Sequence, residues 1–386
     1  MKKIVKTIGT VLLRLLGLVL AAGLCLGASI LAYSARDKKA FGQAQREHLA
    51  ALEAAYRRPD YAPPDEASMT GFDAGAKRDA RLNEVRFLGT HNSYKAYNPS
   101  AEKLMQRLIA PLRLAEGREW SYGFEPLCDQ FDKGIRSIEL DVMREKDGFR
   151  CAHIPVVDVA SNCPDFALAL EEIALWSGAH PGHLPFTVLI EAKDTLLSGG
   201  MVFHRFNLDD VLLLDKLAAD AFGERLYTPA EMLGEHEDFL QLRAADDYPA
   251  LSDLLGKIIV IYHYAGATTE AYVAHDPTLR TQRMFPSIGQ WAYYGNEGLD
   301  DSYACFLIDN WSDSPYMEEN TRVKNMLVRT RVDVFPWRGD AWEAQAMSTG
   351  AFILTTDFPP RDVPGEEPHV AAFEGGATAG AMPADE

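Results

Sequence analysis

The stretch GIRSIELDV at residues 134–142 does most to set the expected fold. Its second half, Ser137–Val142, is a short, mostly apolar run, and such runs are typical of strands that are buried on both faces. Similar runs occur at residues 85–88, 186–190, 257–262, 305–308, 326–328 and 351–354, and helical stretches such as 163–176, 209–222 and 341–349 lie between them. This alternation predicts an α/β fold with a parallel sheet, either closed into a barrel or left open.

Polar side chains end three of these expected strands. The first strand runs into GTHNSY at residues 89–94, the second contains two carboxylates, and the third runs into EAKD at residues 191–194. Carboxylates two positions apart on a strand point the same way, and the carboxyl ends of barrel strands surround the active site. We therefore expect one cluster of oxygen ligands with net negative charge, formed by Asn92, Glu139, Asp141 and Glu191.

Such a cluster needs positive charge, and Ca²⁺ or Mg²⁺ suits carboxylate and amide oxygens. The alternative is that the carboxylates pair with Arg136, Lys193 or Arg331. Two histidines are well placed for proton transfer, because His91 ends the first strand and His153 follows the second. Histidines near a metal can act as general base and general acid around a phosphoryl group.

Together these motifs resemble the catalytic half of the phosphatidylinositol-specific phospholipases C, and most closely their calcium-dependent bacterial branch. The resemblance rests on GTHNSY, on the G-x-R-x-x-E-L-D-V pattern at 134–142, and on the later His153 and Glu191. Residues 326–333 and 350–359 also resemble closing strands of that branch, so the similarity covers roughly residues 85–361. It implies a distorted TIM (β/α)₈ barrel that forms a single catalytic domain.

The resemblance also implies roles for individual residues. The four cluster residues would hold one Ca²⁺, with Mg²⁺ less suitable, while His91 and His153 would do the acid–base work. The inositol 2-hydroxyl would attack the phosphodiester to give a cyclic phosphate and diacylglycerol, and either histidine could be the base. From their charge and position, the candidate phosphate contacts are Lys95, Arg136, Lys193 and Arg331.

Two other functions stay open at this stage. The chain could be a related barrel phosphodiesterase that acts on a glycerophosphodiester or another headgroup. Those enzymes usually begin with His-Arg-Gly, whereas this chain has His91-Asn92-Ser93. It could also be a non-catalytic envelope protein that keeps the barrel as a calcium-stabilised binding module.

The N-terminal segment is basic and then apolar. Residues 15–33 are a run of 19 uncharged residues, long enough to cross a bilayer as a helix. We expect a hydrophobic helix that is either a retained signal anchor or a signal peptide cleaved near Ala32-Tyr33-Ser34. Basic residues before the run predict a cytoplasmic N-terminus. The catalytic body would then be exported, anchored to the bacterial inner membrane and facing the periplasm, or secreted after cleavage.

The formal charge of −18 is divided into +6 over residues 1–39 and −24 over the remainder. So acidic a body is unsuited to binding nucleic acid, which requires Lys and Arg to neutralise phosphates. Its expected partners are a phospholipid or other phosphodiester substrate and the membrane that holds the N-terminal segment. The expected divisions are the anchor or signal peptide (1–39), a helical and linker segment (40–84), the barrel (85–362) and a disordered tail (363–386).

Two smaller expectations concern the body. Its four cysteines permit two disulfides, and the pair Cys151–Cys163 would close a short loop; the alternative is that all four are free, buried thiols. The acidic insertion at residues 223–249 is expected to shape the substrate mouth.

Overall fold

The computed structural model describes residues 2–97, 122–153, 160–194, 204–290, 294, 300–334, 338–360 and 369–383. Before residue 35, it describes the side chains only in part.

The predicted barrel is confirmed. Parallel strands pair in sequence around a closed ring, and the ring is completed by contacts of β1 with both β10 and β2. Within the described residues the barrel strands are β1 (Val85–Thr90), β2 (Ser137–Glu145), β4 (Phe186–Ala192), β6 (Ile258–Tyr262), β7 (Phe285–Gly289), β8 (Phe306–Ile308), β9 (Leu327–Arg331) and β10 (Ile353–Thr356). All their carboxyl ends therefore open on one mouth.

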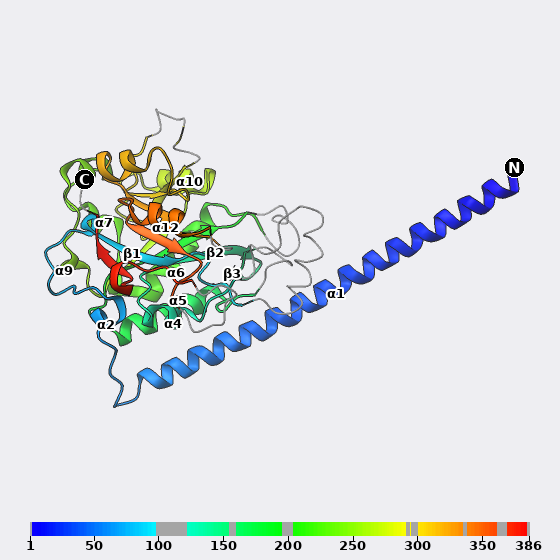
Figure 1. Cartoon of the computed structure of the whole chain (residues 1–386), viewed down its shortest axis with the longest axis horizontal. Helices are drawn as coiled ribbons and strands as arrows, with labels where there is room; N and C mark the ends of the chain where they lie inside the picture. Colours follow the sequence, from blue (N-terminus) through cyan, green and yellow to red (C-terminus); the bar gives the residue numbers. More distant parts are fainter. Residues whose placement is uncertain are drawn as a thin grey trace.

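Helices cover the outside of the barrel (Figure 1). Side-chain caps begin the two longest, with Asp165 preceding α5 and Asn207 preceding α6. Their apolar faces pack inward, as Trp176 of α5 does against Phe186 of β4 and against Phe131 of the neighbouring helix. The described helices of the barrel are α4 (Leu127–Asp132), α5 (Phe166–Ala179), α6 (Leu208–Phe222), α10 (Ala267–His275) and α12 (Asp340–Met347).

Short helices and strands lie outside the eight barrel strands. Strand β3 (Gly148–Cys151) forms a hairpin with the end of β2, beyond the mouth. The others are α2 (Glu66–Thr70), η1 (Leu82–Glu84), η3 (Gly223–Arg225), β5 (Leu226–Tyr227), α7 (Pro229–Leu233), α8 (Phe239–Ala245), α9 (Leu251–Leu254), η4 (Glu319–Val323), η5 (Glu374–Gly376) and β11 (Ala379–Ala381).

Strands β1 and β2 approach each other closely at the seam where the barrel closes. The two strands pair at a single register position, Gly89 opposite Ser137. A Cβ atom at Gly89 would lie 2.7 Å from the Cβ of Ser137 and 2.8 Å from its carbonyl oxygen. The glycine that opens GTHNSY is therefore required so that the barrel can close.

The predicted disordered tail is wrong for the part that the structure describes, residues 369–383, which contains strand β11. Because β2 meets β1 only at Gly89, the amino-terminal part of β1 has backbone groups without a partner from β2. Strand β11 pairs with β1 there in antiparallel fashion, with Val85 opposite Ala381. Backbone pairing needs no large apolar side chains, so the Gly/Ala-rich composition of the tail concealed this strand.

The acidic insertion lies at the base of the barrel and not at its mouth. Its strand β5 pairs with the first residues of β6, where Leu226 lies opposite Ile258. The base is the amino end of the strands, opposite the predicted site. The cysteines also differ from expectation, since Cys151 and Cys163 are buried free thiols.

A long helix, α1 (Lys2–Tyr56), precedes the barrel and runs without interruption through the boundary predicted at residue 39. Its C-terminal part packs against the body, and its N-terminal part extends away from it (Figure 1). Most side chains of the predicted anchor, residues 15–33, lie outside the described residues. In the part of the chain that is described, no helix is both long and apolar enough to cross a bilayer.

The seam yields a stability prediction. Replacing Gly89 with alanine forces a methyl group into Ser137, so the free energy of unfolding should fall by about 1–3 kcal/mol. Chemical denaturation measures this change. The matched control is Gly42→Ala in α1, where the nearest atom to an added Cβ is an Arg46 side-chain nitrogen at 3.6 Å. This control should be neutral or slightly stabilising; equal stability of both variants would contradict the account of the seam.

Candidate active site

Three predicted carboxylates meet at the mouth. Glu139 and Asp141 come from β2, Glu191 comes from β4, and their ligand atoms lie within 4.8 Å of one another. The register of the two strands explains this, because Asp141 lies directly opposite Glu191. Glu139 and Asp141 are almost fully buried. Like charges buried this closely repel each other unless positive charge is supplied.

Asn92 joins the cluster through its backbone conformation. Its φ of 56° lies in the left-handed region, which asparagine adopts more readily than most residues. The Tyr94 hydroxyl lies 2.9 Å from Oδ2 of Asp141 and 3.2 Å from Oδ1 of Asn92. The Nδ2 group of Asn92 donates to the Tyr122 hydroxyl at 2.9 Å. The GTHNSY motif thus brings an amide oxygen to the carboxylates of β2.

Two cations of the chain contact the carboxylates. Nζ of Lys193 lies 2.6 Å from Oε1 of Glu191 and 3.3 Å from Oδ2 of Asp141. The guanidinium of Arg329, from β9 across the barrel, pairs with Glu139. The alternative prediction, that the carboxylates form ion pairs, is therefore correct in part. Lys193 was among the predicted partners, whereas Arg329 was not.

Burial and these partners set the pKa values. Burial raises the pKa of Asp141 to about 7, although Lys193 opposes the shift, while the charge of Glu191 adds to it. Burial opposes ionisation of Glu139, but Arg329 together with other nearby positive groups, Arg331 among them, outweighs it and lowers the pKa of Glu139. Burial also opposes ionisation of Glu191, but Lys193 together with other nearby positive groups outweighs it and lowers the pKa of Glu191. Asp141 is thus the carboxyl that is least compensated by the chain itself.

A hard divalent cation fits this donor set. Two cationic side chains pair with the three carboxyl groups, and Asp141 is left as the least compensated of them. Oδ1 of Asp141 is buried and has no hydrogen-bond partner in the structure. Carboxylate and amide oxygens are the ligands that Ca²⁺ takes in proteins. Asn92, Glu139, Asp141 and Glu191 would be the residues that hold it.

His91 lies beside the cluster between two charged groups. Its Nδ1 is 3.0 Å from Oδ1 of Asp357, the residue that follows β10. Its Nε2 is 2.8 Å from a guanidinium nitrogen of Arg331 at the end of β9. Burial first, and then the positive charge of Arg331, lower the pKa of His91 although Asp357 opposes them. The imidazole is therefore neutral at pH 7.

His153 lies just after β3 and is half-buried. Its charge acts on Asp141 and lowers the pKa of that carboxyl, which means that the imidazole lies near the cluster. His263 follows β6 and acts in the same way on Glu191.

The four candidate phosphate contacts lie in different parts of the barrel. Lys193 and Arg331 lie at the mouth, as described above. Lys95 is buried, with its Nζ 5.1 Å from the centre of the Tyr122 ring. Arg136 is not brought to the site: it precedes β2 at the base, where it pairs with Glu66 at 2.7 Å.

Sequence reasoning missed Arg329 and Asp357. Arg329 stands two positions before Arg331 in LVRTR, so both side chains point the same way from β9. This alternation could have predicted that Arg329 points into the barrel as Arg331 does. Asp357 directly follows the last barrel strand, just as His91 directly follows the first, so the same argument could have predicted it.

Asp357 is itself held by another buried carboxyl. Oδ1 of Asp333 accepts the backbone N–H of Asp357 at 2.8 Å, and Oδ2 accepts the Thr356 hydroxyl at 2.6 Å. Burial, and then the charge of Asp357, raise the pKa of Asp333 to about 8. The loop that positions the partner of His91 therefore rests on a group that is largely protonated at neutral pH.

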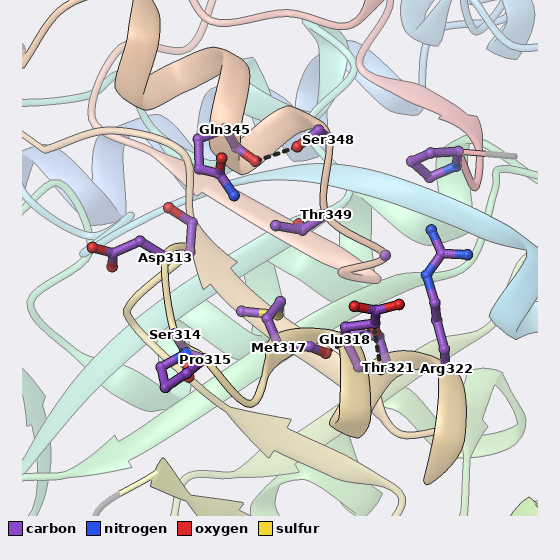
Figure 2. A pocket seen from close by; sticks show the side chains of 13 residues that line it. Asp313, Ser314, Pro315, Met317, Glu318, Thr321, Arg322, Gln345, Ser348 and Thr349 are labelled. Carbon is purple, nitrogen blue, oxygen red and sulfur yellow. Dashed lines mark hydrogen bonds between the residues drawn. The ribbon is translucent and has the colours of Figure 1, made fainter. Parts of the chain in front are cut away.

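A separate cavity of about 1100 Å³ lies between residues 312–322, which connect β8 to β9, and the end of α12 (Figure 2). Its walls include Met317, Arg322, Gln345 and Thr349. No predicted site residue lines it, so it is distinct from the cluster at the mouth.

A closed barrel with a histidine-flanked group of oxygen ligands at its mouth fits the class of metal-assisted barrel enzymes. The family model described as "Phosphoinositide phospholipase C, Ca2+-dependent" matches residues 80–152 and 143–383. The chain therefore belongs to this family, and with it to the phosphodiesterases of the phospholipase C type. Among curated protein sequences, none matches the chain significantly.

Solved structures show the same fold. A calcium-dependent phosphoinositol-specific phospholipase C from a Pseudomonas species is 17% identical, with 83% of this chain and 100% of that chain covered and a TM-score of 0.56. A Ca²⁺-dependent phosphatidylinositol-specific phospholipase C from Streptomyces antibioticus is 19% identical, covering 72% of this chain and 94% of that chain with a TM-score of 0.52.

The uncompensated charge of the cluster predicts calcium binding. At 100-fold excess over its dissociation constant, Ca²⁺ should raise the free energy of unfolding by about 2.7 kcal/mol. Thermal denaturation with and without Ca²⁺ measures the gain. Asp141→Asn should abolish most of it, whereas Asp220→Asn, on the exposed face of α6, should retain it. No gain in the unaltered protein would mean that Lys193 and Arg329 alone neutralise the cluster.

Asp333 yields a pH prediction. A carboxyl whose pKa is raised on folding binds its proton more tightly in the folded protein. Its contribution to stability therefore falls as pH rises from about 4, the unfolded pKa, to about 8. Asp333→Asn should flatten the pH dependence of the free energy of unfolding across this window, as urea titrations would measure. An unchanged slope would show that Asp333 is already ionised in the folded protein.

Proposed function

We propose that the protein is a calcium-dependent phosphodiesterase that cleaves the headgroup from a phosphoinositide-type lipid with two histidines as acid and base. The observation that carries the proposal is the position of His91, held between Asp357 and Arg331 beside the acidic cluster. Ca²⁺ bound to the cluster would lower the pKa of a coordinating hydroxyl and offset negative charge on the phosphoryl oxygens.

His91 is prepared to accept a proton. The Asp357 carboxylate beside Nδ1 favours the tautomer that carries its proton there, which leaves the lone pair on Nε2. Arg331 donates to that lone pair at 2.8 Å and cannot give up its own proton. A phosphate oxygen that draws Arg331 to itself would release Nε2 toward the attacking hydroxyl.

The proposed reaction follows from this arrangement. The inositol 2-hydroxyl oxygen forms a bond to phosphorus as its proton passes to one histidine. The bond from phosphorus to the glycerol oxygen breaks, and the other histidine protonates that alkoxide. The products are an inositol cyclic phosphate and diacylglycerol. We assign the base to His91 because its carboxylate partner stabilises the imidazolium, and the acid to His153.

The same proposal extends to location. The uncharged run at residues 15–33 and the basic residues before it support an exported body that is held at the outer face of a bacterial inner membrane. Cleavage after the run would release the body instead.

Variants of the site test the proposed function. His91→Ala should reduce turnover of phosphatidylinositol by about 10²-fold or more, since general acid–base catalysis contributes 10²–10⁴-fold. Asp357→Asn should reduce it less and shift the pH profile, because the histidine keeps its ring but loses its carboxylate partner. Phosphorus-containing products are followed in the presence of Ca²⁺, and folding is checked by circular dichroism.

The matched control is His275→Ala, at the exposed end of α10. It should leave turnover unchanged. Full turnover in folded His91→Ala would exclude the proposed base. Turnover of glycerophosphodiesters alone would favour the related phosphodiesterase, and binding without turnover would favour the non-catalytic module.

A further inference from the structure

Helix α1 is fixed to the barrel along its C-terminal third, and its contacts run in a definite order. Nζ of Lys38 pairs with Oε1 of Glu145 at 2.5 Å. Further along, Nε2 of His48 lies 3.4 Å from Oε1 of Glu172, and the Tyr56 ring lies 5.7 Å from the ring of His180. These contacts begin at the end of β2 and then follow α5 to its last turn.

The attachment is specific, because Gln45 is 1% exposed and satisfied at both ends of its amide. Its Nε2 donates to the carbonyl of Asp165 at 2.9 Å, and its Oε1 accepts the backbone N–H of the same residue at 2.9 Å. Asp165 is the N-cap of α5. Leu52 and Tyr56 pack against the core on the same side.

This order fixes the direction of α1 relative to the mouth. A helix that follows a barrel strand starts near the mouth and runs back toward the base, so Asp165 marks the mouth end of α5. Gln45 contacts that end and Tyr56 contacts the base end. The residues before Lys38 must therefore project beyond the mouth, as the free part of α1 does in Figure 1.

The uncharged run ends close to this level. Tyr33 precedes Lys38 by five residues, or about 8 Å of helix. The polar headgroup layer on each side of a bilayer is about 5–8 Å thick. If residues 15–33 are embedded in lipid, the end of the β2–β3 hairpin at Glu145 lies at the headgroups, and the mouth opens toward them.

The surface of the mouth agrees with this placement. Trp311, 46% exposed, follows β8, and Tyr97, 36% exposed, lies in the segment after β1. Exposed Trp and Tyr side chains are favoured at the headgroup level. The body of the protein is strongly acidic and would be repelled by an anionic bilayer. A rigid attachment to an embedded helix overcomes that repulsion.

We propose that α1 is a rigid spacer that holds the mouth of the barrel against the bilayer in which residues 15–33 are embedded. The substrate is then a lipid of that same bilayer and not a soluble phosphodiester; this choice of substrate rests on the proposed function, whereas the orientation does not.

Fluorescence quenching by lipid tests the orientation without any reaction. In a Cys25→Ser background, where the remaining cysteines are buried, Asp147→Cys labels the exposed turn of the β2–β3 hairpin. Asp253→Cys, exposed in α9 at the base, is the matched control. The full chain is placed in phosphatidylcholine vesicles that contain a headgroup-level quencher. Quenching should be at least threefold stronger for the label at 147. Equal quenching, or stronger quenching at 253, would overturn the proposal.

A helical insertion tests the consequence for the substrate. Eleven helix-forming residues inserted between Tyr33 and Lys38 lengthen α1 by about 16 Å. Because eleven residues make about three full turns, the two parts of the helix keep nearly the same rotation about its axis. Turnover of phosphatidylinositol in the same vesicles should fall at least tenfold, while turnover of a dissolved short-chain phosphatidylinositol stays unchanged. Unchanged vesicle turnover would overturn the spacer. If neither substrate reacts with the unaltered chain, the proposed function fails, and the quenching pattern alone decides the orientation.

Discussion

The mutual repulsion of three buried carboxylates is the constraint on which the site depends. Glu139, Asp141 and Glu191 lie within 4.8 Å of one another in a closed barrel, where their charge cannot be dispersed into water. The chain supplies Lys193 from the same region and Arg329 from the opposite wall, and Asp141 stays the least compensated carboxyl. A divalent cation at the mouth would supply the positive charge that this carboxyl lacks.

The same closure positions His91, the proposed base. Strand β1 ends in His91 beside the cluster, and the last two barrel strands bring Arg331 and Asp357 to opposite nitrogens of its ring. These contacts require β10 to return to β1, and β1 to approach β2 through Gly89. Local sequence therefore supplies each group, but only closure places His91 next to the carboxylates. The proposed orientation of α1 would add a third requirement, that this mouth face a bilayer.

Much of the candidate site could be predicted from the sequence because polar residues interrupt or follow the apolar runs of the barrel strands. Asn92 and Glu191 stand where an apolar run gives way to polar residues, whereas Glu139 and Asp141 alternate with apolar residues inside the second run. The structure brings the three carboxylates and the asparagine together. Arg136 could have been excluded by the same rule, since it precedes its strand and so lies at the base. Arg329 could not be assigned a partner, because its pairing with Glu139 spans 190 residues and depends on which strands face each other. Strand β11 was hidden because its pairing uses backbone groups that any composition provides.

The central claim is that the mouth of this barrel uses calcium to cleave a phosphoinositide-type diester. Phosphorus NMR of the full chain with phosphatidylinositol in mixed micelles tests it most directly, first with Ca²⁺ and then with excess chelator. The account predicts a cyclic phosphodiester resonance that grows with Ca²⁺ and stops when the chelator is added. Equal turnover in chelator, or no phosphorus-containing product under either condition, would contradict it.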